Sequence, residues 1–571
     1  MSKSFLLALL TTMTLSVSAQ QTVQIRVNQV GYYPDQEKTA VVEGINQNTK
    51  IVFKNEKGKS VLKTKPVRMA KSPWGDKERY IVDFSSLKKP GNYRMEVNGQ
   101  SQAFTVRNGA LNDLSRAALK LFYLIRSGVP IEKEFAGEYA RPAGHLDTHV
   151  LVHPSAATEQ RPEGFVISSP YGWYDAGDYN KYIVNSAYTV AVMLLSYAEN
   201  EAYYKGLDTH IPESGNGTAD LLDEVMFNLK WMLTMQDPND GGVYHKLTTP
   251  NFEGFIMPKD CQQQRYVVAK SVTATYDFAA VMAQAARIFR GNPDYAGFAA
   301  QAEQQAVKAY QWAQANPKAF YNQMALSREF KPAVNTGTYG DFNAQDEQFW
   351  AATELYLLTR DGSYLADARN SMPKAFTTPT WGMVASLGAL EWVKSANEPL
   401  TQEMRNQLKE YADKRIEKVG ESSFQAPFGD SKGDFGWGCL AEQCCMPAIA
   451  LLYADKYLDK GKYMVHAMQN VDYMLGRNAL GYCYVTGFGQ KSPMHPHHRI
   501  SEADGIEAPF PGMLVGGPNA GQQDKGAGIT YLSNLPDESY LDVMDSYASN
   551  EIAINWNGAL VALLGWLDAI Y

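Results

Sequence analysis

The sequence predicts a mainly α protein in which a small antiparallel β-sandwich precedes an (α/α)6 barrel of paired helices. Residues from about 22 to 107 form short alternating segments rich in Val, Ile, Tyr and Phe, which is typical of strands. From about 110 onward, apolar residues recur at spacings of three and four, which is typical of helices. A chain of 571 residues is also too long for one ordinary domain, so two units are expected.

The N-terminal unit contains the segments VQIRVNQ, TAVVE, KIVFKN, RYIVDF, NYRMEV and SQAFTV. Turn residues separate them, as in Tyr33-Pro34-Asp35 and Pro90-Gly91-Asn92. This pattern predicts an antiparallel sandwich over residues 22–107. The connection around Arg107-Asn108-Gly109 is very short, so we expect the sandwich to pack on the second unit and stabilise it instead of binding glycan.

The second unit, residues 110–571, contains roughly twelve segments with helical periodicity. They start near 110, 185, 218, 271, 295, 345, 363, 381, 401, 440, 461 and 550. Successive pairs joined by long loops favour a closed toroid, although periodicity alone also allows a bundle or a solenoid. The loops at 128–184, 237–270, 419–438 and 477–549 lack sustained helical periodicity, and loops of that length in a compact domain are usually functional.

The first 19 residues are typical of a signal peptide. Lys3 supplies positive charge, residues 5–10 are apolar, and Val17-Ser18-Ala19 resembles a cleavage site. The apolar run is too short to span a membrane. No cysteine lies near the cleavage point, so we expect no lipid anchor there. We therefore expect a secreted or periplasmic protein without stable membrane insertion.

The net charge restricts the class of binding partner, and the cysteine content indicates the state of the thiols. The net charge of −8 argues against nucleic acid and suits a neutral polysaccharide. Five cysteines leave at least one free thiol in an exported protein, and their spacing matches no zinc pattern. Cys444 and Cys445 lie in a helical run, so buried free thiols are expected.

The segment GWYDAGDYNKY, residues 172–182, is the first candidate site. Asp175 and Asp178 lie three residues apart in a tight turn, where both carboxylates can face one water and orient it. Like charges so close should raise at least one pKa. Nearby aromatics such as Trp173 suit a sugar-binding cleft. A solvated turn or a calcium loop remains an alternative.

Glu551, in YASNEIAINWNG, is the second candidate. We expect Ser549 or Asn550 to cap a helix whose first turn contains Glu551. A glutamate in the first turn complements the helix dipole, so its presence needs no catalytic role to explain it. The dipole would lower the pKa of Glu551. A general acid at this position requires apolar burial or nearby aspartate charge to raise that pKa.

The third candidate is SPMHPHHRI, where His495, His497, His498 and Arg499 crowd one loop. Three histidines suggest a metal, but no cysteine or carboxylate lies at ligand spacing within the segment, and Arg499 disfavours a cation. The alternative is a set of fixed donors for sugar hydroxyls.

Together and in this order, DAGDYNKY, HPHHR and YLDVMDSYASNEIAINWN resemble glycoside hydrolase family 9, the family of many endoglucanases. IRVNQVGYYPD is similar to the immunoglobulin-like domain found in one branch, and DPNDGGVYHK and QDEQFWAATELYLLTRDGSY also match family segments. The resemblance covers essentially the whole mature chain. It implies an (α/α)6 barrel, an inverting mechanism and no required cofactor.

The resemblance also implies roles for individual residues. Asp178 is the base, Asp175 helps to hold the nucleophilic water, and Glu551 protonates the leaving oxygen. The substrate contacts that the resemblance implies are His497, Arg499 and Tyr547. Trp173 is expected to contact the sugar as well, because it is an aromatic residue beside the two aspartates.

Three segments depart from the family pattern. Gly144 in RPAGHLD stands where relatives have a zinc-binding cysteine, so we expect that zinc site to be absent or crippled. Asp346 and Glu347 match a calcium-binding segment, but Phe342 and Asn343 replace its small ligands. The family's WGSN-like segment reads WGCL at residues 437–440, which changes the lining of the cleft.

The leading hypothesis is an inverting endo-β-1,4-glucanase that hydrolyses cellulose-like glucan. The alternatives are xyloglucan, mixed-linkage or exo-acting hydrolysis by the same chemistry, a non-catalytic glycan-binding protein, and a metal-dependent hydrolase that uses the histidine loop. The joint presence of Asp175, Asp178 and Glu551 favours an enzyme over a binding protein, because binding alone does not need these groups.

Overall fold

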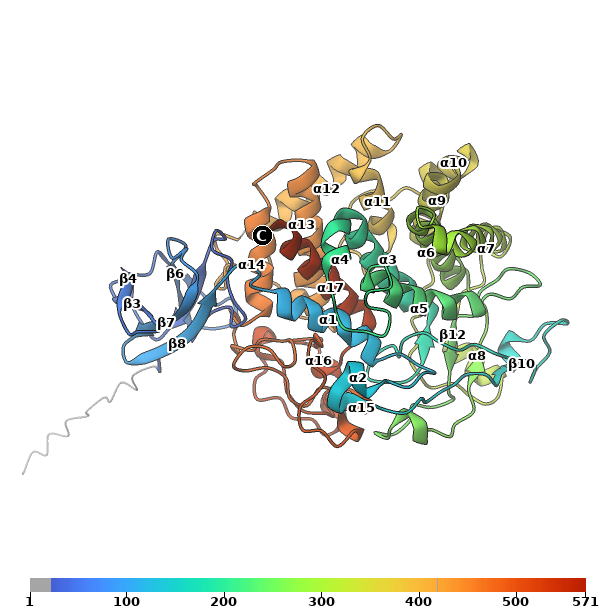
Figure 1. Ribbon diagram of the computed structural model, residues 1–571, viewed down its shortest axis with the longest axis horizontal. Coiled ribbons are helices and arrows are strands. Elements are labelled where there is room, and N and C mark those ends of the chain that lie inside the picture. Colours follow the sequence, from blue (N-terminus) through green and yellow to red (C-terminus); the bar gives the residue numbers. More distant parts are fainter. Residues whose placement is uncertain (1–21, 418) are drawn as a thin grey trace, which may run out of the picture.

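The computed structural model describes residues 22–417 and 419–571. The predicted signal peptide, residues 1–19, lies outside this range. A β-rich unit stands beside a larger helical unit, with the first in blue at one end of the molecule (Figure 1). Within the described residues, no helix combines the length and the apolar character needed to cross a membrane.

Two four-stranded sheets form the N-terminal unit, with strand orders β1-β2-β6-β5 and β4-β3-β7-β8. All the pairings are antiparallel, and apolar side chains from both sheets fill one core that includes Phe53, Phe84 and Phe104. The sequence segments missed β4 and β5, which alternate weakly. The strands are β1 Gln24–Arg26, β2 Thr39–Glu43, β3 Ile51–Asn55, β4 Ser60–Thr64, β5 Arg68–Lys71, β6 Glu78–Asp83, β7 Gly91–Val97 and β8 Gln100–Val106.

Six helices of the second unit form a closed inner ring, in which α3 packs on α6, α6 on α9, α9 on α11, α11 on α13, α13 on α17, and α17 on α3 again. Inner helices such as α3 are buried nearly all round, as expected for helices enclosed by others. The contact between α17 and α3 closes the barrel, so the predicted (α/α)6 fold is confirmed. The inner helices are α3 Ile183–Glu199, α6 Val272–Phe289, α9 Gln345–Thr359, α11 Ala385–Lys394, α13 Met446–Tyr457 and α17 Ile554–Ile570.

An outer layer of helices covers this ring. Among the described residues, five shorter helices interrupt the loops or follow an inner helix, and a π-helix at Leu440–Cys445 leads into α13. The outer helices are α1 Asn112–Leu124, α5 Asp220–Thr234, α7 Ala296–Ala315, α10 Gly362–Asn370, α12 Thr401–Ile416 and α14 Met464–Met474. The shorter ones are α2 Lys133–Ala136, α4 Glu201–Gly206, α8 Gln323–Glu329, α15 Arg499–Ala503 and α16 Tyr547–Asn550.

The long loops at 128–184 and 237–270 also contain a five-stranded sheet with the order β10-β9-β13-β12-β11. Its strands are too short to give an alternating pattern, so periodicity did not reveal them. The sheet braces the chain directly before α3, because β11 leads into that helix. The strands are β9 Val150–Val152, β10 Val166–Ile167, β11 Lys181–Tyr182, β12 Lys246–Thr248 and β13 Tyr266–Val267.

A buried polar interface joins the sandwich to the barrel. The Arg79 guanidinium is 1% exposed and forms ion pairs with Glu43 of the sandwich at 2.9 Å and with Asp537 of the barrel at 3.1 Å. The Asn28 amide donates to Asp472 at 3.0 Å. Tyr33 stacks on the C-terminal Tyr571 with ring centroids 4.4 Å apart. These contacts support the expectation that the two units pack tightly.

Candidate active site

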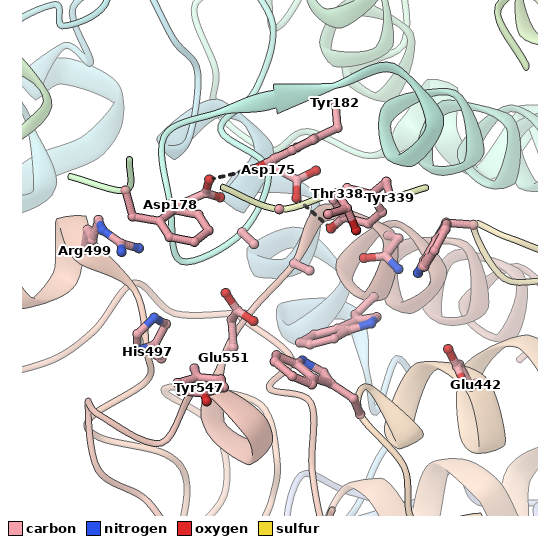
Figure 2. Close-up of a pocket in the computed structure, with 18 residues that line it drawn as sticks. Asp175, Asp178, Tyr182, Thr338, Tyr339, Glu442, His497, Arg499, Tyr547 and Glu551 are labelled. Atoms are coloured by element: carbon pink, nitrogen blue, oxygen red, sulfur yellow. Dashed lines mark hydrogen bonds between the residues drawn. The ribbon is translucent and has the colours of Figure 1, made fainter. Parts of the chain in front are cut away.

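A cavity of about 830 Å³ lies at the end of the barrel where the inner helices begin. Part of its lining comes from segments that precede inner helices: Tyr182 before α3, Tyr339 before α9, Trp381 before α11 and Glu551 before α17. The volume is typical of a ligand-binding cleft. Figure 2 shows Asp175, Asp178 and Glu551 facing the same space from opposite walls.

Asp175 and Asp178 lie in the turn before β11, and both are almost fully buried. Asp178 accepts hydrogen bonds from the Tyr182 hydroxyl at 3.1 Å and from the Asn180 side-chain amide. Asp175 accepts from the Tyr339 hydroxyl at 2.7 Å and from Asn185 at 2.8 Å. Each carboxylate is therefore held in one orientation by at least two hydrogen bonds, as pre-organised chemistry requires.

Gly177, between the two aspartates, permits a close approach to the histidine loop. A Cβ at this position would overlap the carbonyl oxygen of His497. The carbonyl of Gly177 accepts hydrogen bonds from the Arg499 guanidinium at 2.6 Å and from the Arg499 amide at 3.2 Å. The turn and the histidine loop are thus packed main chain against main chain.

Glu551 does not lie in the first turn of a helix. It follows the short helix α16, Tyr547–Asn550, and precedes α17, which begins at Ile554 with the uncapped Ala553 as its N-cap. The predicted caps Ser549 and Asn550 and the predicted dipole effect are therefore wrong. The chain is extended at Glu551 because its backbone pairs with His497 and its carbonyl accepts the Gly516 amide at 2.9 Å.

Burial in the cleft raises the pKa of Glu551 to about 8, and the negative charges of Asp178 and Asp175 add to the shift. Burial and the charge of Asp178 also raise the pKa of Asp175. At neutral pH, Glu551 is therefore mainly protonated and can donate a proton. This is the property that the sequence alone required of a general acid.

His497, Arg499 and Tyr547 all line the cavity, as predicted for substrate contacts. The Nδ1–H of His497 donates to the Met544 carbonyl at 2.7 Å, which leaves Nε2 as an acceptor. Trp437 lies against Tyr547, with ring centroids 5.5 Å apart. The side chains supply both polar groups and flat apolar faces to a bound sugar.

Trp173 does not line the cavity, so its predicted sugar contact is wrong. Its side chain is fully buried, packs on Phe122 with ring centroids 4.6 Å apart and donates to Glu224 at 3.3 Å. The indole lies against the barrel wall, because its partners Phe122 and Glu224 belong to the outer helices α1 and α5. Trp173 supports the turn from behind.

The sequence motifs missed several residues of the cavity. Thr338, Tyr339 and Trp381 lie in loops without a repeat or a charge pattern, so only their positions before inner helices mark them. Asn555 and Trp556 lie in the first turn of α17. Tyr339 holds Asp175, and Glu442 lies in the π-helix before α13, at the far side of the cavity from Arg499 (Figure 2). The other missed lining residues include Phe252, Thr338, Trp381, Asn555 and Trp556.

The three histidines of the third motif do not converge on one point. His497 bonds to Met544, whereas the Nδ1 of the buried His498 pairs with Ser501 at 2.9 Å, and the backbone of His495 donates to Asp542 at 2.9 Å. This arrangement supports fixed polar contacts in place of the metal-dependent alternative.

Comparison with known protein families shows which family has the sequence of this chain. Residues 112–564 match the family model described as glycosyl hydrolase family 9, and residues 20–102 match the cellulase N-terminal ig-like domain. The chain belongs to glycosyl hydrolase family 9. This family 9 enzyme is a glycoside hydrolase of the endoglucanase type, and the predicted family, fold class and enzyme class are confirmed.

Similar proteins cover nearly the whole chain. The xyloglucan-specific endo-beta-1,4-glucanase BoGH9A of Bacteroides ovatus is 52% identical over 98% of this chain and 96% of its own length. Endoglucanase D of Acetivibrio thermocellus is 33% identical over 95% of this chain and 83% of its own. The solved structure titled Bacteroides ovatus GH9 has a TM-score of 0.91 at 51% identity, covering 96% of this chain and 99% of that one.

The zinc position expected from the family does not fit this chain. A Cβ at Gly144 would overlap the main chain of Pro258, so a cysteine cannot be accommodated there without moving that segment. This observation supports the expectation that the family's zinc site is absent or crippled.

Proposed function

We propose that this family 9 enzyme is an inverting endo-β-1,4-glucanase, with Asp178 as general base and Glu551 as general acid. The observation that carries the proposal is the placement of a carboxyl group with a pKa raised to about 8 across the cavity from two oriented aspartates. An inverting glycosidase uses one carboxylic acid and one carboxylate on opposite sides of the scissile bond.

In the proposed reaction, the Asp178 carboxylate takes a proton from a water while the water oxygen attacks the anomeric carbon. The bond from that carbon to the leaving oxygen breaks, and the proton of Glu551 moves to the leaving oxygen. Asp175, held by Tyr339 and Asn185, orients the water. Inversion converts a β-linkage into an α-configured product.

His497, Arg499 and Tyr547 are proposed to contact the sugar. The fixed Nε2 acceptor of His497 can receive a sugar hydroxyl, and Arg499 stands between Phe252 and Phe255, with its guanidinium 5.4 Å and 5.3 Å from their ring centroids. Trp381, Trp437 and Trp556 line other parts of the cavity. Their flat faces suit pyranose rings.

Xyloglucan is the proposed preferred substrate, and undecorated β-1,4-glucan is the second candidate. The 52% identity with a xyloglucan-specific relative, over almost all of both chains, favours xyloglucan. The endoglucanase relatives at about one-third identity keep the second candidate open.

Proton NMR of the anomeric signals during hydrolysis tests the mechanism, and a substrate panel tests specificity. If α-anomer appears first, inversion is supported; early β-anomer contradicts it.

A higher kcat/KM on xyloglucan than on carboxymethylcellulose or mixed-linkage glucan supports the substrate proposal. A rapid drop in viscosity relative to reducing-end release distinguishes endo from exo action. Binding without turnover on the whole panel would instead favour the glycan-binding protein.

A structural calcium ion is proposed beside α9. Asp346 is engaged by the Val384 amide at 2.9 Å and by Asn343 at 3.0 Å, but the oxygens of the buried Glu347 and Asp277 receive no hydrogen bond from the protein. Burial raises the pKa of both groups. Clustered carboxylates suit a hard cation. Chelation with EGTA should lower the melting temperature, and readdition of calcium should restore it; an unchanged melting temperature would contradict the site.

We further propose that residues 22–107 form the sandwich domain and residues 110–571 the catalytic domain. We also propose export to the periplasm or the cell exterior after removal of residues 1–19. N-terminal sequencing of the protein recovered from cell fractions tests this.

A further inference from the structure

A cluster of three different metal-ligating groups lies beside the turn that contains Asp175 and Asp178, where the His145 ring contacts the ring of Tyr179. One ligand atom each from His145, Glu253 and Cys261 lies within 4.8 Å of the other two. His145 belongs to the loop before β9, Glu253 to the loop after β12, and Cys261 directly follows a short 3-10 helix at Pro258–Asp260. The cluster therefore joins two of the long loops that surround the cleft.

The hydrogen bonds of His145 leave its ring nitrogen Nε2 free to bind. The Tyr174 hydroxyl donates to the Gly144 carbonyl at 3.3 Å, so its oxygen can accept the Nδ1–H of His145 at 3.0 Å. Nε2 then carries a lone pair, and it is buried without any hydrogen-bond partner. Fixing the tautomer through the other ring nitrogen is how proteins prepare histidine for a metal.

The other two groups also lack strong partners. Glu253 has a buried carboxylate oxygen, Oε1, without a hydrogen bond. The Cys261 sulfur makes only a long contact with the Met257 carbonyl at 3.7 Å. Burying unpaired polar atoms costs free energy, which a bound cation would offset at all three groups.

We propose that His145 Nε2, the Glu253 carboxylate and the Cys261 thiolate bind one zinc ion. Imidazole, carboxylate and thiolate are the three side-chain ligand types of zinc, and the fourth tetrahedral position is left for a water. This ligand set differs from the family position at Gly144, because Glu253 and Cys261 come from another loop and no side chain at 144 takes part.

Hydrogen bonds connect the proposed zinc site to the cleft. The carbonyl of Glu253 accepts a hydrogen bond from Arg499 Nε at 2.8 Å, and Arg499 in turn donates to Gly177 between the two aspartates. The Tyr179 hydroxyl donates to the Ile256 carbonyl at 2.7 Å in the same loop. Zinc would therefore hold the loop that supports Arg499, and its role is structural.

The test is calorimetric titration of metal-stripped mature enzyme with zinc, in saturating calcium so that carboxylate sites stay filled. We expect one zinc per chain and a higher melting temperature. Cys261→Ser and Glu253→Gln should each weaken binding by more than about a hundredfold. Cys483→Ser is the control, since that thiol is buried far along the chain and contacts the Val485 carbonyl.

Two readouts on the unmodified protein keep the test decisive if a variant folds poorly. Cobalt substitution should give a thiolate-to-metal charge-transfer band, and zinc should protect one cysteine from thiol reagents, because Cys261 is partly exposed whereas the other four are buried. No zinc binding in the micromolar range, or unchanged binding with Cys261→Ser and no charge-transfer band, would overturn the proposal.

Discussion

The carbonyl oxygen of Asp175 accepts a hydrogen bond from the amide of Ile554, 2.8 Å away. This bond joins the turn that contains Asp178 directly to the first residue of α17, three positions after Glu551. The two segments that contain the proposed catalytic carboxyl groups are thus fixed relative to each other by a main-chain contact. Disturbing this frame should therefore affect kcat more than KM.

Glu551→Gln should lower kcat on xyloglucan by about 10²–10⁴-fold, because the amide cannot donate an acidic proton. The loss should be much smaller on an aryl cellobioside with a dinitrophenolate leaving group, which departs without protonation. Comparing both substrates in the wild type and the variant checks this. An equal loss on the two substrates would contradict the general-acid role.

The pH dependence of kcat/KM should reflect the ionisation of Glu551. Because the pKa of Glu551 is raised to about 8, its acid form is present below that pH and is lost as the pH rises through it. We therefore expect kcat/KM on xyloglucan to fall on the alkaline side near pH 8. The aryl substrate should show a weaker alkaline fall. A decline that begins near pH 5 would be inconsistent with the protonated Glu551.

Asp178→Asn should lower kcat by about 10²–10⁴-fold with little change in KM, since the base acts only in the transition state. Tyr339→Phe provides a graded comparison. It removes one donor to Asp175 and should lower kcat roughly tenfold, the usual effect of losing one hydrogen bond to a charged group. Steady-state kinetics on one substrate compares the two variants.

Gly177→Ala should damage both folding and turnover, because the new Cβ would overlap the His497 carbonyl oxygen. We expect a loss of about 1–3 kcal/mol in the free energy of unfolding, measured by urea denaturation. Gly254→Ala is a matched control, since a Cβ there meets no atom within 4 Å. Equal stability of the two variants would disprove the close packing.

Arg79→Ala should lower the free energy of unfolding by about 3–5 kcal/mol, because it leaves Asp537 and Glu43 without their buried partner. The matched control is Lys54→Ala, which breaks a partly exposed pair with Glu96 and should cost less than about 1 kcal/mol. Denaturant midpoints distinguish the two. A small effect at Arg79 would mean that the interface does not depend on this pair.

Local patterns in the sequence predicted much of the fold and the main motifs of the site. Alternation revealed most strands of the sandwich, and the spacing of apolar residues located the inner helices, since both depend on near neighbours in the chain. The motifs around Asp178, His497 and Glu551 identified the family because their order along the chain is specific.

Only the tertiary structure decided the state of these groups. The pKa of Glu551 depends on burial and on Asp178, which is hundreds of residues away in the chain, so the local helix-dipole argument had the wrong sign. Trp173 turned out to be a supporting residue because its orientation depends on what packs behind it. Closure of the ring, the role of Tyr339 and the meeting of His145 with Cys261 likewise arise from contacts between distant segments, which no local pattern encodes.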